Sequence, residues 1–215
     1  MDFCALDVET ANANFSSICQ IGISKFRNGE VFDELVLLIN PESFFDEINI
    51  KIHGITQLDI KDAPTFASAW PSVINFIKSD VIVSHTTFDK TSINQACTKN
   101  KVCFLDNQWL DCTRVVRRVW EQYKKSGYGL KNLASEFDIA FQHHDALADA
   151  RTCGIILVKA IENSTSSFDE WLVKQFERKP SPEIRSYDAN PNGSFYGQSI
   201  VFTGEINMPR REAAR

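Results

Sequence analysis

Two acidic residues near the N-terminus have a spacing that suits a metal site. Asp7 and Glu9 lie within residues 3–10, an apolar run typical of a buried strand. Because side chains alternate along a strand, both carboxylates are expected on one face, while Leu6 and Val8 point into the core. Carboxylates held side by side repel each other unless cations lie between them, and oxygen ligands favour Mg²⁺ or Mn²⁺. An acidic strand end entering a loop gives the same pattern, so the interpretation needs partners further along the chain.

A second acidic group follows a short apolar strand expected at residues 81–84. Asp89 lies at the start of a helix expected from about 88 to 99, and His85 and Phe88 lie beside it. Open α/β sheets place ligands at the carboxyl ends of their strands, so Asp89 is a candidate partner for the first pair. The alternative explanation is the helix dipole, which favours an acidic residue in a first turn. Phe88 is equally compatible with a place in the core.

A third group opens a helix expected over residues 145–161. Asp145 is a good N-cap, which leaves His144 in the loop before the helix and Asp149 in its first turns. A histidine beside a fixed carboxylate suits a base that takes a proton from water, because imidazole titrates near neutral pH. The same residues also have a simple structural explanation as a cap, a helix-dipole acid and surface histidines.

The elements that must position these groups change character along the chain. Residues 3–10, 17–26 and 31–40 have the pattern of three sequential strands, with Asn28-Gly29 as a hairpin turn. After these strands helical periods alternate with short apolar strands, and Pro71 is expected to kink or restart one helix. The pattern predicts an α/β fold in which a mixed five-stranded sheet, an antiparallel meander plus parallel strands, is flanked by helices on both faces. The remaining expected elements are a strand at 109–111 and helices near 66–77, 113–123, 130–137 and 168–176.

The composition narrows the class of protein. A net charge of −5 argues against a protein that coats long nucleic acid, but not against an enzyme that grips a few nucleotides where bound metals supply positive charge. The six cysteines contain no Cys-x-x-Cys pair. Most of them lie in apolar surroundings and are therefore expected to be buried thiols in a reducing cytoplasm, not a zinc site or a disulfide framework. No apolar run approaches the roughly 20 residues that span a bilayer, and no signal peptide is recognisable, so we expect a cytoplasmic protein without membrane contact.

Taken in order, the three groups have the patterns Asp-x-Glu, His-x-x-Phe-Asp and His-x-Ala-x-x-Asp. This order resembles the DEDDh branch of the DnaQ-like 3′→5′ exonucleases, the family of the proofreading epsilon subunit of bacterial DNA polymerase III. The resemblance covers residues 1–163, with further similar stretches at 17–22, 53–56 and 128–134. The matching residues are Asp7, Glu9, Asp89, His144 and Asp149.

The resemblance implies a ribonuclease H-like fold and hydrolysis assisted by two Mg²⁺ or Mn²⁺ ions. It implies that the four matching acids are metal ligands and that the matching histidine is the base. The departures from many family members leave the subfamily and the substrate preference open: Thr86 stands where Asn is common, and Ala11-Asn12 where Thr-Gly is common. The pocket for the terminal nucleotide would be lined by Thr10, Ala11, His85 and Phe88.

The end of the chain resembles a different domain. Residues 196–204, followed by Arg210-Arg211, look like the first strand and helix start of a BRCT domain. We therefore expect a DEDDh exonuclease domain at 1–163, an amphipathic helix and linker at 164–196, and a truncated BRCT-like start at 197–215. Such a tail would offer a surface for a protein partner.

The expected function is a metal-dependent 3′→5′ exonuclease. It would release nucleoside 5′-monophosphates from the 3′ end of DNA, single-stranded or frayed, in proofreading or repair. The BRCT-like tail favours DNA over RNA by analogy. The alternatives are 3′-end trimming of RNA and a non-catalytic docking scaffold. A scaffold predicts the loss of at least one metal ligand, and all the ligands are present.

Overall fold

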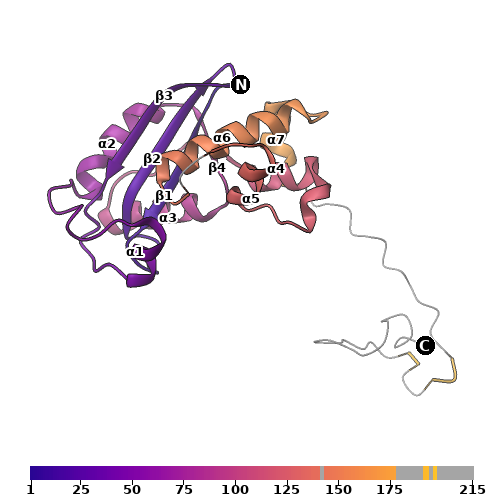
Figure 1. The fold of residues 1–215 in the computed structure, drawn as a ribbon, viewed down its shortest axis with the longest axis horizontal. Coiled ribbons are helices and arrows are strands. Elements are labelled where there is room, and N and C mark those ends of the chain that lie inside the picture. The colour runs from indigo at the N-terminus through magenta and orange to yellow at the C-terminus, as the bar shows by residue number, and fades with distance from the viewer. Residues whose placement is uncertain (141–142, 178–190, 194–195, 198–215) are drawn as a thin grey trace. The chain divides into compact units, whose positions relative to one another are not determined.

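Strand β1 (Phe3–Thr10) occupies the centre of a five-stranded sheet with the order β3-β2-β1-β4-β5 (Figure 1). Strands β2 (Ile18–Arg27) and β3 (Glu30–Leu38) continue it as an antiparallel meander. On its other side, β4 (Val81–Ser84) and β5 (Trp109–Asp111) are parallel to it. The predicted mixed sheet is confirmed.

The computed structural model describes residues 1–140, 143–177, 191–193 and 196–197. The chain forms two units, of which the first runs from Met1 to Phe176. This unit includes helix α7 (Phe168–Lys174), because Phe168 and Trp171 are buried in its core. The domain boundaries predicted at residues 163 and 196 remain predictions. The predicted BRCT-like start lies outside the described residues from residue 198 onward.

Strand β1 is buried on both faces. Phe3 belongs to one apolar cluster, whereas Leu6 and Val8 belong to a second cluster on the opposite face, as predicted. A strand without a polar face is typical of a sheet covered by helices on both sides. Asp7 and Glu9 continue the face of Phe3, so on this face the apolar pattern gives way to carboxylates at the carboxyl end of the strand.

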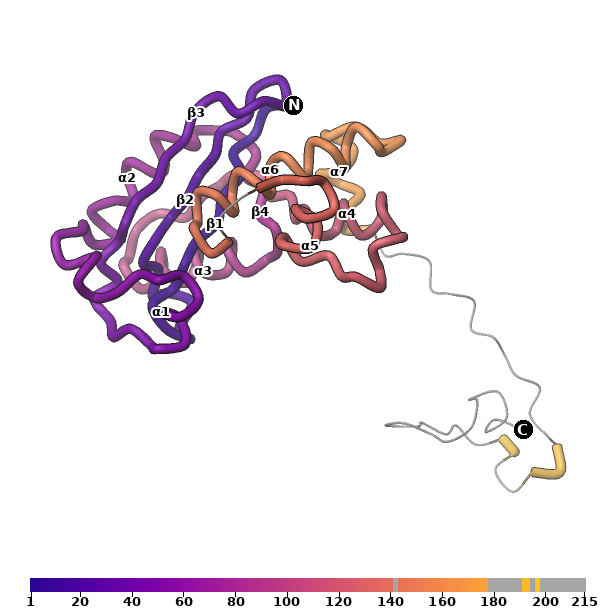
Figure 2. The backbone as a smooth tube through the Cα atoms, viewed as in Figure 1, coloured from indigo at the N-terminus to yellow at the C-terminus, as the bar shows by residue number. Residues whose placement is uncertain are grey.

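Helices cover both faces of the sheet (Figures 1 and 2). They are α1 (Glu47–His53), α2 (Phe66–Ile77), α3 (Phe88–Asn100), α4 (Cys112–Val119), α5 (Leu130–Glu136), α6 (Ala146–Glu162) and α7, with a 3₁₀ turn η1 (Glu121–Lys124). One apolar cluster joins β1 to α4, α5, α6 and α7, and the other joins it to α2 and α3. Helix α6 packs along β1 and β2. Within the described residues, no helix is long and apolar enough to cross a membrane.

Two helices differ from the predictions. Helix α2 is continuous through Pro71, although a kink or a restart was expected there. Pro71 itself is exposed, while Trp70 and Val73 on either side of it are buried, so packing holds the helix across the missing N–H donor. Helix α1 was not predicted. None of its residues is buried, so the sequence carries no inward-facing period for it.

The start of α6 lies directly against β2. A Cβ atom at Gly22 would lie 2.2 Å from both the carbonyl carbon of Ala146 and the amide nitrogen of Leu147. The Ala146 N–H also donates to the side chain of Gln20 at 3.0 Å. Because the close approach is between backbones, no flexible side chain can move aside. Gly22 therefore sets the position of the α6 N-terminus, and with it the position of Asp149.

We expect Gly22→Ala to lower the free energy of unfolding by about 2–3 kcal/mol, because α6 has to move away from the sheet. The matched control is Gly129→Ala, since a Cβ there meets no atom within 4 Å and φ is −64°. Urea unfolding followed by circular dichroism measures both variants. Equal stability of the two variants would contradict the role given to Gly22.

Candidate active site

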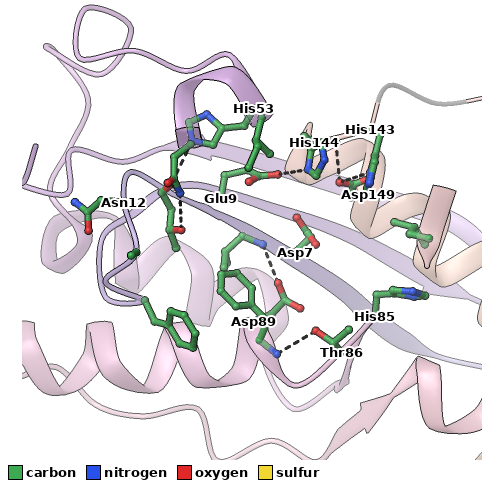
Figure 3. A pocket seen from close by; sticks show the side chains of 18 residues that line it. Asp7, Glu9, Asn12, His53, His85, Thr86, Asp89, His143, His144 and Asp149 are labelled. Carbon is green, nitrogen blue, oxygen red and sulfur yellow. Dashed lines mark hydrogen bonds and ion pairs between the residues drawn. The ribbon is translucent and has the colours of Figure 1, made fainter. Parts of the chain in front are cut away.

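Side chains from three elements meet around one pocket at the carboxyl end of β1 (Figure 3). Asp7 and Glu9 come from β1, Asp89 from the first turn of α3, and Asp149 from the first turn of α6. Single carboxylate oxygens of Asp7, Glu9 and Asp149 lie within 4.8 Å of one another. The pocket has a volume of about 470 Å³ and is also lined by His144. The structure thus places all five residues predicted to be catalytic around the same pocket.

Asp89 is tied to the main chain of β1. The Val8 N–H donates to Asp89 Oδ1 at 3.1 Å, which fixes the start of α3 beside the acidic end of the strand. Burial raises the pKa of Asp89 to about 7, against the opposing effect of the Val8 hydrogen bond. The carboxylate is therefore positioned by the backbone.

The pocket concentrates negative charge where little water screens it. Burial, followed by the charges of Asp89 and Asp149, raises the pKa of Asp7 well above its usual range. Burial, then Asp149 and Asp89, raises the pKa of Glu9 from 4.5 to about 8. These shifts mean that the folded protein takes up protons when no other cation is bound. The donor set consists of carboxylate oxygens, which fits hard divalent cations such as Mg²⁺ and Mn²⁺.

His144 lies in the loop just before α6, as the capping pattern predicted. Asp145 caps the helix by accepting from the Ala148 N–H at 2.9 Å. The backbone of His144 has a φ of 67°, and its N–H donates to Asp149 Oδ2 at 2.9 Å. Its ring Nδ1 lies 3.8 Å from Glu9 Oε1, and its side chain is 40% exposed. The ring is therefore near the carboxylates while the backbone holds the loop to Asp149.

His143 is a pocket residue that the sequence analysis missed. Its Nδ1 lies 2.9 Å from Asp149 Oδ1, and its ring stacks on that of His144 with centroids 3.9 Å apart. Burial, and then the charge of His143, lowers the pKa of His144. The sequence signal was the adjacent pair of histidines, for which the sequence also allowed a simple surface position. The structure places both rings on the pocket.

Helix α1 adds a further side of the pocket that was not predicted. His53 Nε2 lies 3.2 Å from the carbonyl oxygen of Thr10, and Asn49 donates to the same oxygen at 2.8 Å. Both residues line the pocket with Ile52. Burial lowers the pKa of His53. The only sequence signal was the family-like stretch 53–56, which did not lead to a predicted site residue.

Of the four residues predicted to contact the terminal nucleotide, Thr10, His85 and Phe88 line the pocket. Ala11 is not among the lining residues. Its side chain is fully buried, its N–H donates to the carbonyl of Ser17, and its carbonyl accepts from the N–H of residue 46. These bonds tie the Ala11 backbone to the turn and to the start of α1.

Thr86 occupies the turn before α3, where many members of the family resembled carry Asn. Its Oγ1 accepts from the Phe88 N–H at 3.1 Å, so a threonine can stabilise this turn. The ring of Phe88 packs edge to face with that of Phe15 at 4.9 Å. Both aromatic rings line the pocket. With threonine at position 86, the turn and the two aromatic rings still form one wall of the pocket.

Comparison with known proteins identifies the fold and family. A family model described as Exonuclease (RNase T) matches residues 4–157. The PolC-type DNA polymerase III of Caldanaerobacter subterraneus subsp. tengcongensis is 28% identical over 165 residues, and that of Oceanobacillus iheyensis is 27% identical over 164 residues. The matches cover 75% and 74% of this chain but only 12% and 11% of the two relatives.

Solved structures with the same fold include exonuclease X in complex with 5′ overhanging duplex DNA, at a TM-score of 0.64 and 18% identity. That match covers 80% of this chain and 99% of the other. The nuclease domain of 3′hExo, a DEDDh family member bound to rAMP, matches at a TM-score of 0.65 and 16% identity, covering 76% and 92% of the two chains. The ribonuclease H-like fold that the sequence predicted is confirmed.

The raised pKa of Glu9 sets the sign of a pH effect on stability. The pKa of Glu9 is about 8 in the folded protein and about 4.5 in the unfolded chain. The contribution of Glu9 to the free energy of unfolding is therefore fully present below pH 4.5 and is lost as the pH rises through 8. At pH 8 in EDTA, we expect Asp7→Asn to raise the melting temperature by about 2–8 °C, because it removes one of the repelling charges.

The control for this variant is Asp62→Asn, since Asp62 is 88% exposed. Mn²⁺ should raise the melting temperature of the parent and of the control, and much less that of Asp7→Asn. Differential scanning calorimetry at pH 5 and pH 8 measures these shifts. A Mn²⁺ effect that is the same in all three proteins would contradict cation binding at Asp7.

Proposed function

Since the chain belongs to the exonuclease family, we propose that it hydrolyses phosphodiester bonds from the 3′ end of DNA and releases nucleoside 5′-monophosphates. The observation that carries the proposal is the meeting of Asp7, Glu9 and Asp149 oxygens within 4.8 Å, next to His144. A phosphodiester is an anion, so it does not enter such a pocket unless the carboxylate charge is compensated. The proposed activity therefore requires divalent cations.

We assign Asp7, Glu9, Asp89 and Asp149 as the residues that hold two Mg²⁺ or Mn²⁺ ions. Bound there, the ions would supply activation of the attacking water and stabilisation of the leaving 3′-oxygen. The structural support is that the carboxylates are fixed before any ligand arrives. A backbone N–H holds Asp89, and the His144 N–H and His143 ring hold Asp149. Preorganised ligands cost little reorganisation when the substrate binds.

We assign His144 as the general base. Its lowered pKa keeps the imidazole neutral at neutral pH, so a ring nitrogen can accept a proton from water. Once protonated, the imidazolium would lie beside the carboxylates of Glu9 and Asp149, which favour the charged form. The partly exposed ring allows the base to exchange its proton with solvent.

The aromatic wall supports binding of a terminal nucleotide. Phe15 is 38% exposed and contacts Phe88, and both face the pocket that also contains Thr10 and His85. Bases stack on aromatic rings with little sequence preference, which suits an enzyme that removes nucleotides one after another. The DNA polymerase relatives favour DNA as the substrate. RNA is the alternative, since one structure with the same fold holds rAMP.

A direct test separates the base from the metal ligands. We expect His144→Ala to lower kcat by about 10²–10⁴-fold while Mn²⁺ binding is kept, because the lost group is a general base. Asp7→Ala should lose both activity and at least part of the Mn²⁺ binding. Turnover of 5′-labelled single-stranded DNA and calorimetric Mn²⁺ titration give the two readouts, with Asp62→Asn as the control. Turnover of His144→Ala near the parent value at neutral pH would contradict the assignment.

The same assay distinguishes DNA from RNA as the substrate. Single-stranded DNA and RNA labelled at the 5′ end are incubated with Mn²⁺ or Mg²⁺, with and without Asp7→Ala. We expect a ladder of shortened products on DNA and a weaker one on RNA. A stronger ladder on RNA would replace DNA as the substrate. No ladder on either polymer from the folded parent would support the docking scaffold.

The stacking role of Phe15 gives a separate prediction. Phe15→Ala should raise KM by about 5- to 100-fold, because stacking contributes about 1–3 kcal/mol per base, with a smaller change in kcat. Phe32→Ala is the matched control, since Phe32 is 70% exposed on β3 and does not line the pocket. Steady-state kinetics on short DNA oligonucleotides measures both variants. An unchanged KM in Phe15→Ala would remove this residue from the substrate pocket.

A further inference from the structure

Two cysteines and a histidine meet next to the active-site pocket. His85 follows β4, Cys112 begins α4, and Cys153 lies in α6, one helical turn after Asp149. One ring nitrogen of His85 and the two sulfurs lie within 4.8 Å of one another. The sulfurs are screened from solvent, since Cys112 is 0% and Cys153 2% exposed. In Figure 3 the ring of His85 points away from the carboxylates of Asp7 and Asp89.

The hydrogen bonds of His85 show which nitrogen is available. Nε2 lies 2.9 Å from the carbonyl oxygen of Tyr128. Because a carbonyl only accepts, Nε2 carries a hydrogen, and in the neutral ring Nδ1 then carries the lone pair. Nδ1 is buried and makes no hydrogen bond to a nitrogen or oxygen atom of the described residues. The ring interacts with the Cys112 sulfur instead: burial lowers the pKa of His85, but the hydrogen bond and charge of Cys112 outweigh burial and raise it. An imidazole that donates one nitrogen to a carbonyl and keeps the other beside sulfur donors has the arrangement of a metal-binding histidine.

The two thiols complete a donor set that differs from that of the carboxylate pocket. One imidazole nitrogen and two sulfurs suit thiophilic cations, whereas carboxylate oxygens suit Mg²⁺ and Mn²⁺. A hydrogen bond with Cys153 lowers the pKa of Cys112 to about 6 against the opposing effect of burial, and the His85 ring lowers it further. The same hydrogen bond, together with burial, raises the pKa of Cys153. Thiolate is the form that binds metal, so Cys112 is prepared to act as a ligand.

We propose that His85, Cys112 and Cys153 form a second cation site, selective for a thiophilic divalent ion of the Zn²⁺ class. Zn–N and Zn–S bonds of about 2.0–2.3 Å place ligand atoms in tetrahedral directions roughly 3.6–3.8 Å apart. The nitrogen and the two sulfurs here lie within 4.8 Å of one another, so side-chain movements of about 1 Å would bring them to those separations. At neutral pH Cys112 is largely thiolate, so loading the site removes the proton of the Cys153 thiol, and that proton goes to solvent. The proposal does not depend on the nuclease activity.

The site would act as a clamp between the elements that carry the catalytic carboxylates. His85 lies in the connection from β4 to α3, the helix that carries Asp89, and Cys153 shares α6 with Asp149. Cys112 comes from a third element and is 41 residues from Cys153, so the two cysteines form no short sequence motif that would predict the site. This spacing explains why the sequence argued against a zinc site although the fold brings the ligands together.

The test uses Co²⁺ as a spectroscopic substitute for Zn²⁺. The reduced full-length chain is stripped with a chelator, placed in excess Mg²⁺ to fill the oxygen sites, and titrated with Co²⁺. We expect a cobalt–thiolate charge-transfer band in the near ultraviolet that saturates at about one equivalent of Co²⁺ per chain. The band should disappear when Zn²⁺ is added. The band should persist in Asp7→Asn, which alters only the carboxylate pocket. Absence of the band in the folded parent would overturn the proposal.

Variants of the cysteines identify the ligands. Cys112→Ser and Cys153→Ser should each abolish the band. Each should also weaken Zn²⁺ binding by more than about 100-fold, because loss of a residue that only hydrogen-bonds to a ligand already weakens binding by roughly 10- to 100-fold. Cys97→Ser is the matched control, because Cys97 is a fully buried thiol in the other apolar cluster. A band that persists in Cys112→Ser or Cys153→Ser would overturn the proposal.

A measurement on the parent chain keeps the proposal testable if these variants do not fold. Thiol alkylation in mild urea, mapped by mass spectrometry, should be slowed by Zn²⁺ at Cys112 and Cys153 much more than at Cys97. Equal protection of all three thiols would overturn the proposal, since it would show general stabilisation without ligation.

Discussion

The structure depends on holding several carboxylates close together against their mutual repulsion. Strand β1 can carry Asp7 and Glu9 at its end because its earlier residues are buried on both faces and anchor it in the sheet. The repulsion appears in the raised pKa values of Asp7 and Glu9, which favour uptake of protons or of cations. In the proposed function, the same charge that destabilises the cation-free protein would provide its affinity for divalent ions and, through them, for a phosphodiester anion.

The site combines buried, anchored carboxylates with a more exposed histidine. Asp89 is buried and held by the main chain of β1, and Asp149 is buried near the start of a helix that packs closely on β2 at Gly22. His144 lies in a loop with its ring 40% exposed. Ligands that define the positions of cations have to be fixed, whereas a base has to exchange its proton with solvent. The two kinds of residue are placed accordingly.

Local patterns in the sequence predicted the central sheet, the position of His144 before a capped helix, and the five residues placed around the pocket. Each of these features depends on strand alternation, a cap or an ordered set of motifs. Helix α1, with His53, could not be predicted because it buries none of its residues. His143 has no local signal beyond its neighbour, and its role comes from the contact with Asp149. The cluster of His85 with two cysteines arises only when three distant segments pack together.

The central claim is that the carboxylates enclose a pair of divalent ions. Anomalous diffraction from crystals grown with Mn²⁺ and a nucleoside 5′-monophosphate tests it most directly. The account predicts two Mn²⁺ peaks, roughly 3.5–4 Å apart, between the side chains of Asp7, Glu9, Asp89 and Asp149. Mn²⁺ peaks found only outside this pocket, or a nucleotide bound there without any Mn²⁺ peak, would contradict it.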